Sequence, residues 1–198
     1  MKILKVYYPH ILALLFSVFF IILGIDPVER EVWIVEVTPI IIVFLFLLTT
    51  YNKFRFTNFA YTMMTIWMFW HTVGGHYTFA NVPFDFITNL FGFERNNFDR
   101  IGHFVVGFYA YAIAEYLVRQ KSCSVMLAIL FGFFTIGSVA AGYEVIEWLY
   151  AIYDGGEAGI EFLGSQGDSW DAQKDMFLDM LGAIFSLSLF GITQKIRK

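Results

Sequence analysis

The chain of 198 residues is 58% hydrophobic and 15% charged, with a net charge of −4 and a mean hydropathy of +0.63. A soluble domain carries about 25% charged residues, so this composition predicts an integral membrane protein rather than a soluble enzyme. Thirteen lysines and arginines without a basic patch give no sign of a nucleic-acid partner. The single cysteine, Cys123, excludes an intramolecular disulfide.

Six apolar segments follow one another along the chain, each long enough as a helix to cross a hydrocarbon core of about 30 Å. They do not alternate polar and apolar residues, which favours helices over a barrel. The first follows two lysines but is too long for a signal peptide and lacks a cleavage site, so we interpret it as an uncleaved helix. The sequence therefore predicts an all-α bundle of six transmembrane helices forming a single domain, 1–198, with spans near 8–25, 33–51, 57–77, 101–118, 124–150 and 175–194.

Lysine and arginine predict the orientation, because cytoplasmic loops carry an excess of both. Nine such residues fall on one side of the predicted spans and four on the other, so both termini are expected in the cytoplasm. The nine are Lys2, Lys5, Lys53, Arg55, Arg119, Lys121, Lys195, Arg197 and Lys198. The four are Arg30, Arg95, Arg100 and Lys174.

The loop between the third and fourth predicted spans, NVPFDFITNLFGFERNNF (81–98), contains five phenylalanines. This composition predicts a segment in the outer membrane interface, either amphipathic or re-entrant. An ordinary solvated loop is the alternative interpretation.

Ionisable residues of the spans gather near the predicted outer ends. On the fourth span Asp99 and His103 are spaced i, i+4. On the fifth span Glu144 and Glu147 are spaced i, i+3. Each pair therefore shares a helix face. Each such group costs roughly 2.5–3.5 kcal/mol on insertion scales, so a cluster of them requires a compensating charge. In chain order these residues are Glu36, His71, His76, Asp99, His103, Glu144 and Glu147.

The start of the last span, GDSWDAQKDMFLDMLGA (167–183), carries four aspartates, and Lys174 is expected to point away from them. At 100° per residue, Asp168, Asp171, Asp175 and Asp179 fall within roughly 80° of one helical face. The first two are suited to cap the helix or to stay solvated. The deeper two are expected to face the histidines and glutamates of the neighbouring spans in one pocket open to the outside.

Carboxylates and imidazoles from several helices are ligands for zinc, manganese or magnesium. We therefore predict a divalent metal site, in which Glu144, Asp175 and His103 also carry the chemistry. For His71 and His103, neutral core histidines with one hydrogen bond each are the structural alternative. The predicted ligands are His71, His76, Asp99, His103, Glu144, Glu147, Asp175 and Asp179.

Four segments occur in order along the chain: HTVGGHYTF (71–79), DRIGHFVVGF (99–108), GYEVIEW (142–148) and GDSWDAQKDMFLDMLGA (167–183). Together they resemble the YjdF-like family of bacterial inner-membrane proteins over nearly the whole chain. The resemblance implies a multi-pass protein of the bacterial plasma (inner) membrane, and it supplies no reaction.

The last three predicted spans are also distantly similar to VanZ-like proteins. Two positions depart from that pattern: Arg100 stands where lysine is common, and Asp179 stands where asparagine is usual. The second departure makes the region more acidic and more suited to a metal. The positions that correspond to the pattern are Asp99, Arg100, His103, Glu144, Asp175 and Gly182.

Three functions remain open. The first is a metal-assisted hydrolase or transferase acting on a lipid or lipid-linked headgroup at the extracytoplasmic face, although the chain has no His-Glu-x-x-His, Gly-x-Ser-x-Gly or phosphatase motif. The second is a cation or proton transporter, which requires charged residues toward both faces of the membrane. Glu115 alone meets that requirement, and the sequence shows no inverted repeat. The third is a non-catalytic envelope-stress or antibiotic-resistance binding protein. We favour the first, with membrane lipids and a lipid-linked substrate as partners.

Overall fold

The computed structural model describes all residues except 1, 155, 157, 158, 160, 161, 197 and 198. Two residues that were used to predict the orientation, Arg197 and Lys198, therefore lie outside the described residues. The described residues form helices and turns and contain no strand. The elements are α1 (Lys2–Leu23), α2 (Arg30–Thr50), α3 (Asn58–Tyr77), the 3-10 turn η1 (Phe79–Asn81), α4 (Asp85–Phe91), α5 (Phe98–Val106), α6 (Tyr109–Arg119), α7 (Val125–Asp154) and α9 (Asp171–Ile196).

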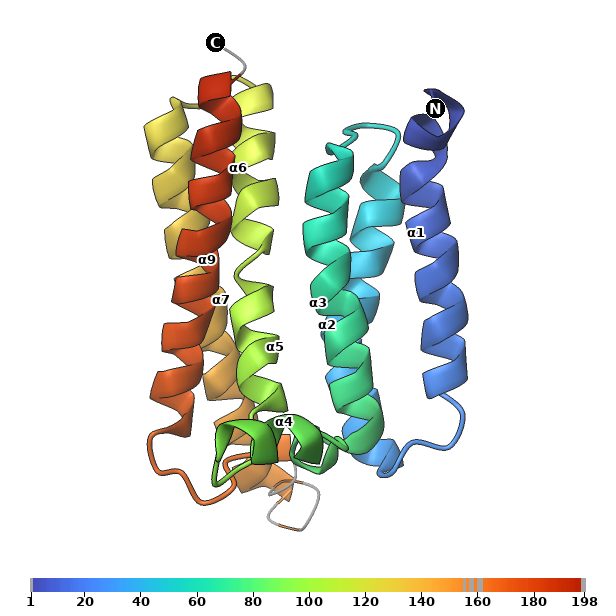
Figure 1. Ribbon diagram of the computed structural model, residues 1–198, viewed down its shortest axis with the longest axis vertical. Helices are drawn as coiled ribbons and strands as arrows, with labels where there is room; N and C mark the ends of the chain where they lie inside the picture. The colour runs from blue at the N-terminus through green and yellow to red at the C-terminus, as the bar shows by residue number, and fades with distance from the viewer. Residues whose placement is uncertain (1, 155, 157–158, 160–161, 197–198) are drawn as a thin grey trace.

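The all-α fold class is confirmed, and the predicted number of spans is close. Within the described residues, five segments are long and apolar enough to cross a membrane: α1, α2, α5 with α6, α7 and α9. The remaining predicted span, 57–77, corresponds to α3, which has 20 residues but is not among these five apolar segments. In Figure 1, α3 returns the chain from the end where α2 finishes to the end where α4 lies.

The helices form two groups, with α1, α2 and α3 in one and α5, α6, α7 and α9 in the other (Figure 1). Helix α3 joins the groups by packing on both α5 and α6. The start of α1 and the end of α9 lie at the same end of the bundle, opposite α4. The two ends of the chain therefore share a side, as predicted, and their cytoplasmic placement stays a prediction.

The position of Cys123 provides a test of this orientation. Cys123 is a half-buried free thiol in the turn before α7, whereas Leu90 on α4 is exposed at the opposite end. We expect a membrane-impermeant maleimide on intact cells to leave Cys123 unlabelled, and to label Leu90→Cys in a Cys123→Ser background. Permeabilised cells serve as the control, because Cys123 should then react. The reverse pattern on intact cells would place the termini outside.

The predicted fourth span is divided into α5 and α6 at Gly107, and the reason is a backbone crossing with α9. A Cβ atom on Gly182 would lie 1.8 Å from the Phe104 carbonyl oxygen, and one on Gly107 would lie 2.3 Å from the Ala183 nitrogen. The Ser186 hydroxyl donates to the Gly107 carbonyl at 3.0 Å. The two glycines therefore hold α5 and α9 at a fixed relative depth.

Glu115 has a structural partner at the opposite end of the bundle from α4. Its carboxylate accepts from the Thr57 backbone N–H at 2.8 Å and from the Thr57 hydroxyl at 2.6 Å. Arg119 donates to the same carboxylate at 2.6 Å. Thr57 is the N-cap of α3 and accepts from the Ala60 N–H. Glu115 thus fixes the start of α3 against α6.

Replacing Glu115 with alanine should lower the free energy of unfolding by about 2–4 kcal/mol, because three donors lose a charged acceptor. Thermal unfolding in detergent measures this loss. Glu115→Gln should lose less, since it keeps one acceptor oxygen at the same position. A Glu115→Ala variant that melts like the wild type but has lost cation transport would instead support the transporter interpretation.

The phenylalanine-rich loop forms η1 and the short helix α4, which lies across the end of the bundle (Figure 1). The last residue of this loop anchors it to α3: Phe98 stacks on Trp70 of α3 with ring centroids 4.2 Å apart, and the Trp70 indole N–H donates to the Phe98 carbonyl. Phe86 and Phe91 on α4 are exposed. The loop is therefore an amphipathic cover over one end and does not enter the bundle.

Candidate functional site

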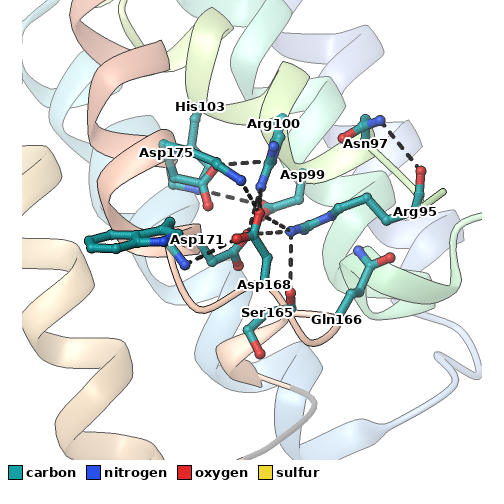
Figure 2. A network of polar contacts seen from close by, with 12 residues as sticks. Arg95, Asn97, Asp99, Arg100, His103, Ser165, Gln166, Asp168, Asp171 and Asp175 are labelled. Atoms are coloured by element: carbon teal, nitrogen blue, oxygen red, sulfur yellow. Dashed lines mark hydrogen bonds and ion pairs between the residues drawn. The ribbon is translucent and has the colours of Figure 1, made fainter. Parts of the chain in front are cut away.

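The first two aspartates of the stripe lie in a network of ion pairs that closes one end of the bundle (Figure 2). Arg100 donates to Asp171 at 3.2 Å and also pairs with Asp168. Arg95, from the loop after α4, pairs with Asp171 as well. Three cations therefore compensate two carboxylates here, since Lys174 Nζ lies 2.6 Å from Asp168.

Two details of the predicted stripe are wrong. Asp168 precedes α9, which begins at Asp171, so it does not lie on the helical face of the other three. Its carboxylate instead accepts from the Trp170 backbone N–H at 3.0 Å, the local turn that aspartate favours before a helix. Lys174 was expected to point away, yet the turn brings Asp168 within its reach.

The charge state of Asp168 follows from these contacts. Hydrogen bonding to the Lys174 ammonium, then to the Trp170 N–H and to Arg100, lowers the pKa of Asp168 well below its usual range. A lowered folded-state pKa gives stability that is complete above the unfolded pKa of about 3.9 and is lost only as the pH falls below it. The closing network should therefore persist throughout the physiological pH range.

The deeper aspartates meet α5 one turn further in. Asp179 accepts from the ring of His103, with Oδ2 3.1 Å from Nδ1. The other ring nitrogen, Nε2, lies 3.5 Å from Asp99 Oδ1. Asp175 approaches the same place from α9, and one ligand atom from each of Asp99, His103 and Asp175 lies within 4.8 Å of the others. Asp99, His103, Asp175 and Asp179 together form the Asp–His cluster.

The geometry of His103 leaves one nitrogen without a matching partner. Both flanking groups are carboxylates, which accept hydrogen bonds and cannot donate when ionised. A neutral imidazole has one N–H, so its second nitrogen would direct a lone pair at a carboxylate. Either a second proton or a cation between His103 Nε2 and Asp99 removes that repulsion. Asp179, which is 1% exposed, is placed to hold Nδ1 in the way carboxylates orient metal-bound histidines.

Two buried carboxylate oxygens of the cluster have no hydrogen-bond partner among the described residues: Oδ1 of Asp175 and Oδ1 of Asp179. Asp175 is 2% exposed, and its closest cation is Arg100, with Nε 4.0 Å from Oδ1. A buried carboxylate oxygen without a partner is costly. With three carboxylates around one histidine, the cluster therefore favours a cation.

A second polar group faces the cluster across a cavity of about 290 Å³. The Tyr143 hydroxyl of α7 donates to Glu36 Oε2 of α2 at 3.2 Å. His71 Nε2 of α3 lies 3.1 Å from the same oxygen. Because Glu36 and His71 are both buried, this group forms a polar contact between three helices at the cavity wall.

The structure brings most of the predicted ligands together. His71, Asp99, His103, Glu147 and Asp179 all line the cavity, and Asp175 joins the cluster beside it. The predicted proximity of the deep aspartates to a histidine is met by the 3.1 Å contact of Asp179 with His103.

Two predicted ligands are placed differently. The His76 ring contacts the Leu23 carbonyl through Nδ1 at 2.7 Å, at the turn between α1 and α2. His76 does not line the cavity. Glu144 does not line the cavity, and its Oε1 is buried with no hydrogen-bond partner in the part of the chain that is described.

Tyr143 was not predicted as a site residue, and no defined role was predicted for Glu36, Arg95 or Arg100. Tyr143 lies four residues before Glu147, so the two side chains share a face of α7, and this spacing is the signal that could have placed Tyr143 in the site. The partners of Arg95 and Arg100 lie in the turn before α9 and at the first residue of that helix, about 70 residues later in the chain, and no local pattern predicts such pairs.

The family model described as a predicted membrane protein (DUF2238) matches residues 8–196. A relative, the inner membrane protein YjdF of Escherichia coli strain K12, is 37% identical over 175 residues, which cover 87% of this chain and 83% of the relative. None of the solved structures matches.

Proposed function

Given that the chain belongs to the family of predicted membrane proteins DUF2238, we propose that it binds a divalent metal ion at one end of its bundle. In this proposal the ion is used in hydrolysis or transfer at the polar head of a lipid or lipid-linked molecule. The site lies at the end of the bundle opposite the chain termini, which is the extracytoplasmic face under the predicted orientation.

The Asp–His cluster is the observation that carries this proposal. Ligands of one zinc ion lie about 2.1 Å from it, so two of them are separated by at most about 4.2 Å. The ligand atoms of Asp99, His103 and Asp175 already lie within 4.8 Å of one another. Small side-chain rotations would suffice to close them on an ion, and Asp179 already holds the far nitrogen of His103.

Three protein ligands leave a coordination position for water or substrate, which is the arrangement of catalytic rather than structural zinc sites. A bound divalent ion lowers the pKa of such a water and polarises an ester or phosphoester oxygen. Glu144 is our candidate for the acid–base group, because its buried Oε1 has no partner among the described residues. In this proposal Asp175 and His103 act as ligands.

The other two functions receive less support. Transport requires a polar path, whereas the charged residues that line the cavity are Glu36, Asp99, Glu147 and Asp179 with the two histidines, all toward one end of the bundle. Glu115 is engaged by Thr57 and Arg119. A non-catalytic binding protein would use the same cavity without needing a metal.

Elemental analysis of the protein purified without chelator tests the proposal. We expect close to one zinc, manganese or magnesium ion per chain, which is removed by EDTA and restored by adding the metal. Protein that carries no metal and takes none up would contradict it. In that case His103 is an imidazolium that bridges Asp99 and Asp179.

A further inference from the structure

The cavity extends well beyond the polar groups at its mouth. Along α7 its lining runs from Glu147 to Thr135, a rise of roughly 18 Å at 1.5 Å per residue. Half of a hydrocarbon core is about 15 Å deep, so the cavity is about as long as one lipid chain. The deeper walls are apolar and include Val43 of α2, Ile113 of α6 and Val139 of α7.

We propose that this cavity binds a single apolar chain of an amphiphile whose polar head lies at the Asp–His cluster. The shape of the cavity supports the location of the apolar chain, and the role of the polar head rests on the metal site proposed above. A volume of about 290 Å³ is at the lower end for a ligand pocket. It therefore suits one chain and leaves the head in the polar part of the site.

The cavity also has a route from the membrane. Helix α2 packs on α3, and α7 packs on α6 and α9, but α2 and α7 do not pack closely on each other within the described part of the chain. Both nevertheless line the cavity. Val139 lines it while remaining 56% exposed, and Thr135 is also exposed. These residues mark a side entrance between α2 and α7 at lipid depth.

The distribution of polarity fixes the direction of the bound chain. Near the polar end, the Tyr143 hydroxyl bonds to Glu36 and joins α7 to α2. Further in, the facing residues of the two helices are Pro39 and Val43 on α2, and Val139 and Thr135 on α7. An apolar chain buries its surface only in this deeper part, at about 25 cal/mol per Å², while a polar head stays with the charged groups.

Photo-crosslinking with a hexadecyl phosphate that carries a diazirine at the end of its chain tests this proposal on the purified full chain. We expect saturable labelling on Val43, Ile113 or the Thr135–Val139 turn, which excess unlabelled hexadecyl phosphate removes. The alcohol without the phosphate should label the same residues more weakly, because its head lacks the anionic oxygens that a metal ion binds.

Val139→Trp should reduce this labelling about tenfold, because a bulky side chain at the entrance removes apolar contact for most of the chain. Val145→Trp is the matched control, since Val145 lies on the same helix and is 51% exposed but does not line the cavity. If the melting temperature of Val139→Trp is lower than that of the control, the experiment uses Thr135→Trp, which changes a second exposed position of the entrance.

Labelling that does not saturate, or that is equal in Val139→Trp and Val145→Trp, would overturn the chain-binding site. The metal content of the same samples keeps the two proposals separate. Protein that retains metal while showing no saturable labelling loses the chain site alone. Protein that labels as expected but binds no metal loses the metal site alone.

Discussion

Asp175→Asn is expected to abolish metal binding while the protein still folds. Asp175 is 2% exposed and belongs to the Asp–His cluster. The substitution keeps the shape of this side chain but removes its charge. Loss of an orienting group alone costs a metal site 10- to 100-fold in affinity, so loss of a ligand should cost about 100-fold or more. Elemental analysis and metal titration of the purified variant measure this effect.

Asp171→Asn is the matched control, because it makes the same change one turn earlier on α9. Asp171 pairs with Arg95 and Arg100 and is not part of the cluster. Added metal should raise the melting temperature of the wild type and of Asp171→Asn, since a ligand that binds only the folded state stabilises it. It should leave Asp175→Asn unchanged.

The opposite outcome has a physical interpretation of its own. If the site holds no metal, Asp175 is a buried carboxylate with an unpartnered oxygen. Removing a buried charge whose closest cation, Arg100, is 4.0 Å away then stabilises the protein, because the desolvation cost exceeds so weak a pairing. An Asp175→Asn variant that melts higher than the wild type, with metal in neither, would reject the metal site.

Gly182→Ala should destabilise the protein by more than about 3 kcal/mol, because the new methyl group meets backbone that cannot rotate away. Its Cβ would lie 1.8 Å from the Phe104 carbonyl oxygen. Relief requires α5 and α9 to separate, which would also draw Asp179 away from His103. Thermal unfolding in detergent and the yield of folded protein measure the loss.

Gly191→Ala on the same helix is the control for this substitution. A Cβ there meets nothing within 4 Å, so the variant should gain up to about 1 kcal/mol from the higher helix propensity of alanine. Equal stability of the two variants would show that the backbones are not in contact at Gly182.

The spans were predictable because each is a long apolar run, and length and hydropathy are local properties of the sequence. Helix α7 illustrates the limit of this signal: it was expected over 124–150 and ends four residues later, at Asp154. The division between α5 and α6 was not predicted. It arises where Gly107 meets Gly182, and the sequence around either glycine does not show that contact.

The position of the candidate site along the helices was predictable, but the directions of its side chains were predictable only in part. Depth follows from position along each span, whereas direction depends on how a helix is rotated. His71 and His76 share a similar depth, yet five residues place them about 140° apart around α3. The structure accordingly directs His71 to Glu36 and His76 to the Leu23 carbonyl. The ion pairs of Arg95 were unpredictable because they join the loop after α4 to the turn before α9 and to the first residue of that helix.

The contact between His103 and Asp179 spans 76 residues of sequence, which has a consequence for biosynthesis. At roughly 5–20 residues per second, the ribosome needs about 4–15 s to make that stretch. During this interval α5 is already available for insertion, but the helix that carries its partners does not yet exist. Nascent α5 therefore waits at the membrane surface with Arg100 and His103 still without their partners from the last helix and the turn before it, and its final depth is fixed only when α9 arrives. Truncation before α9 should accordingly leave an α5 that quality-control proteases recognise.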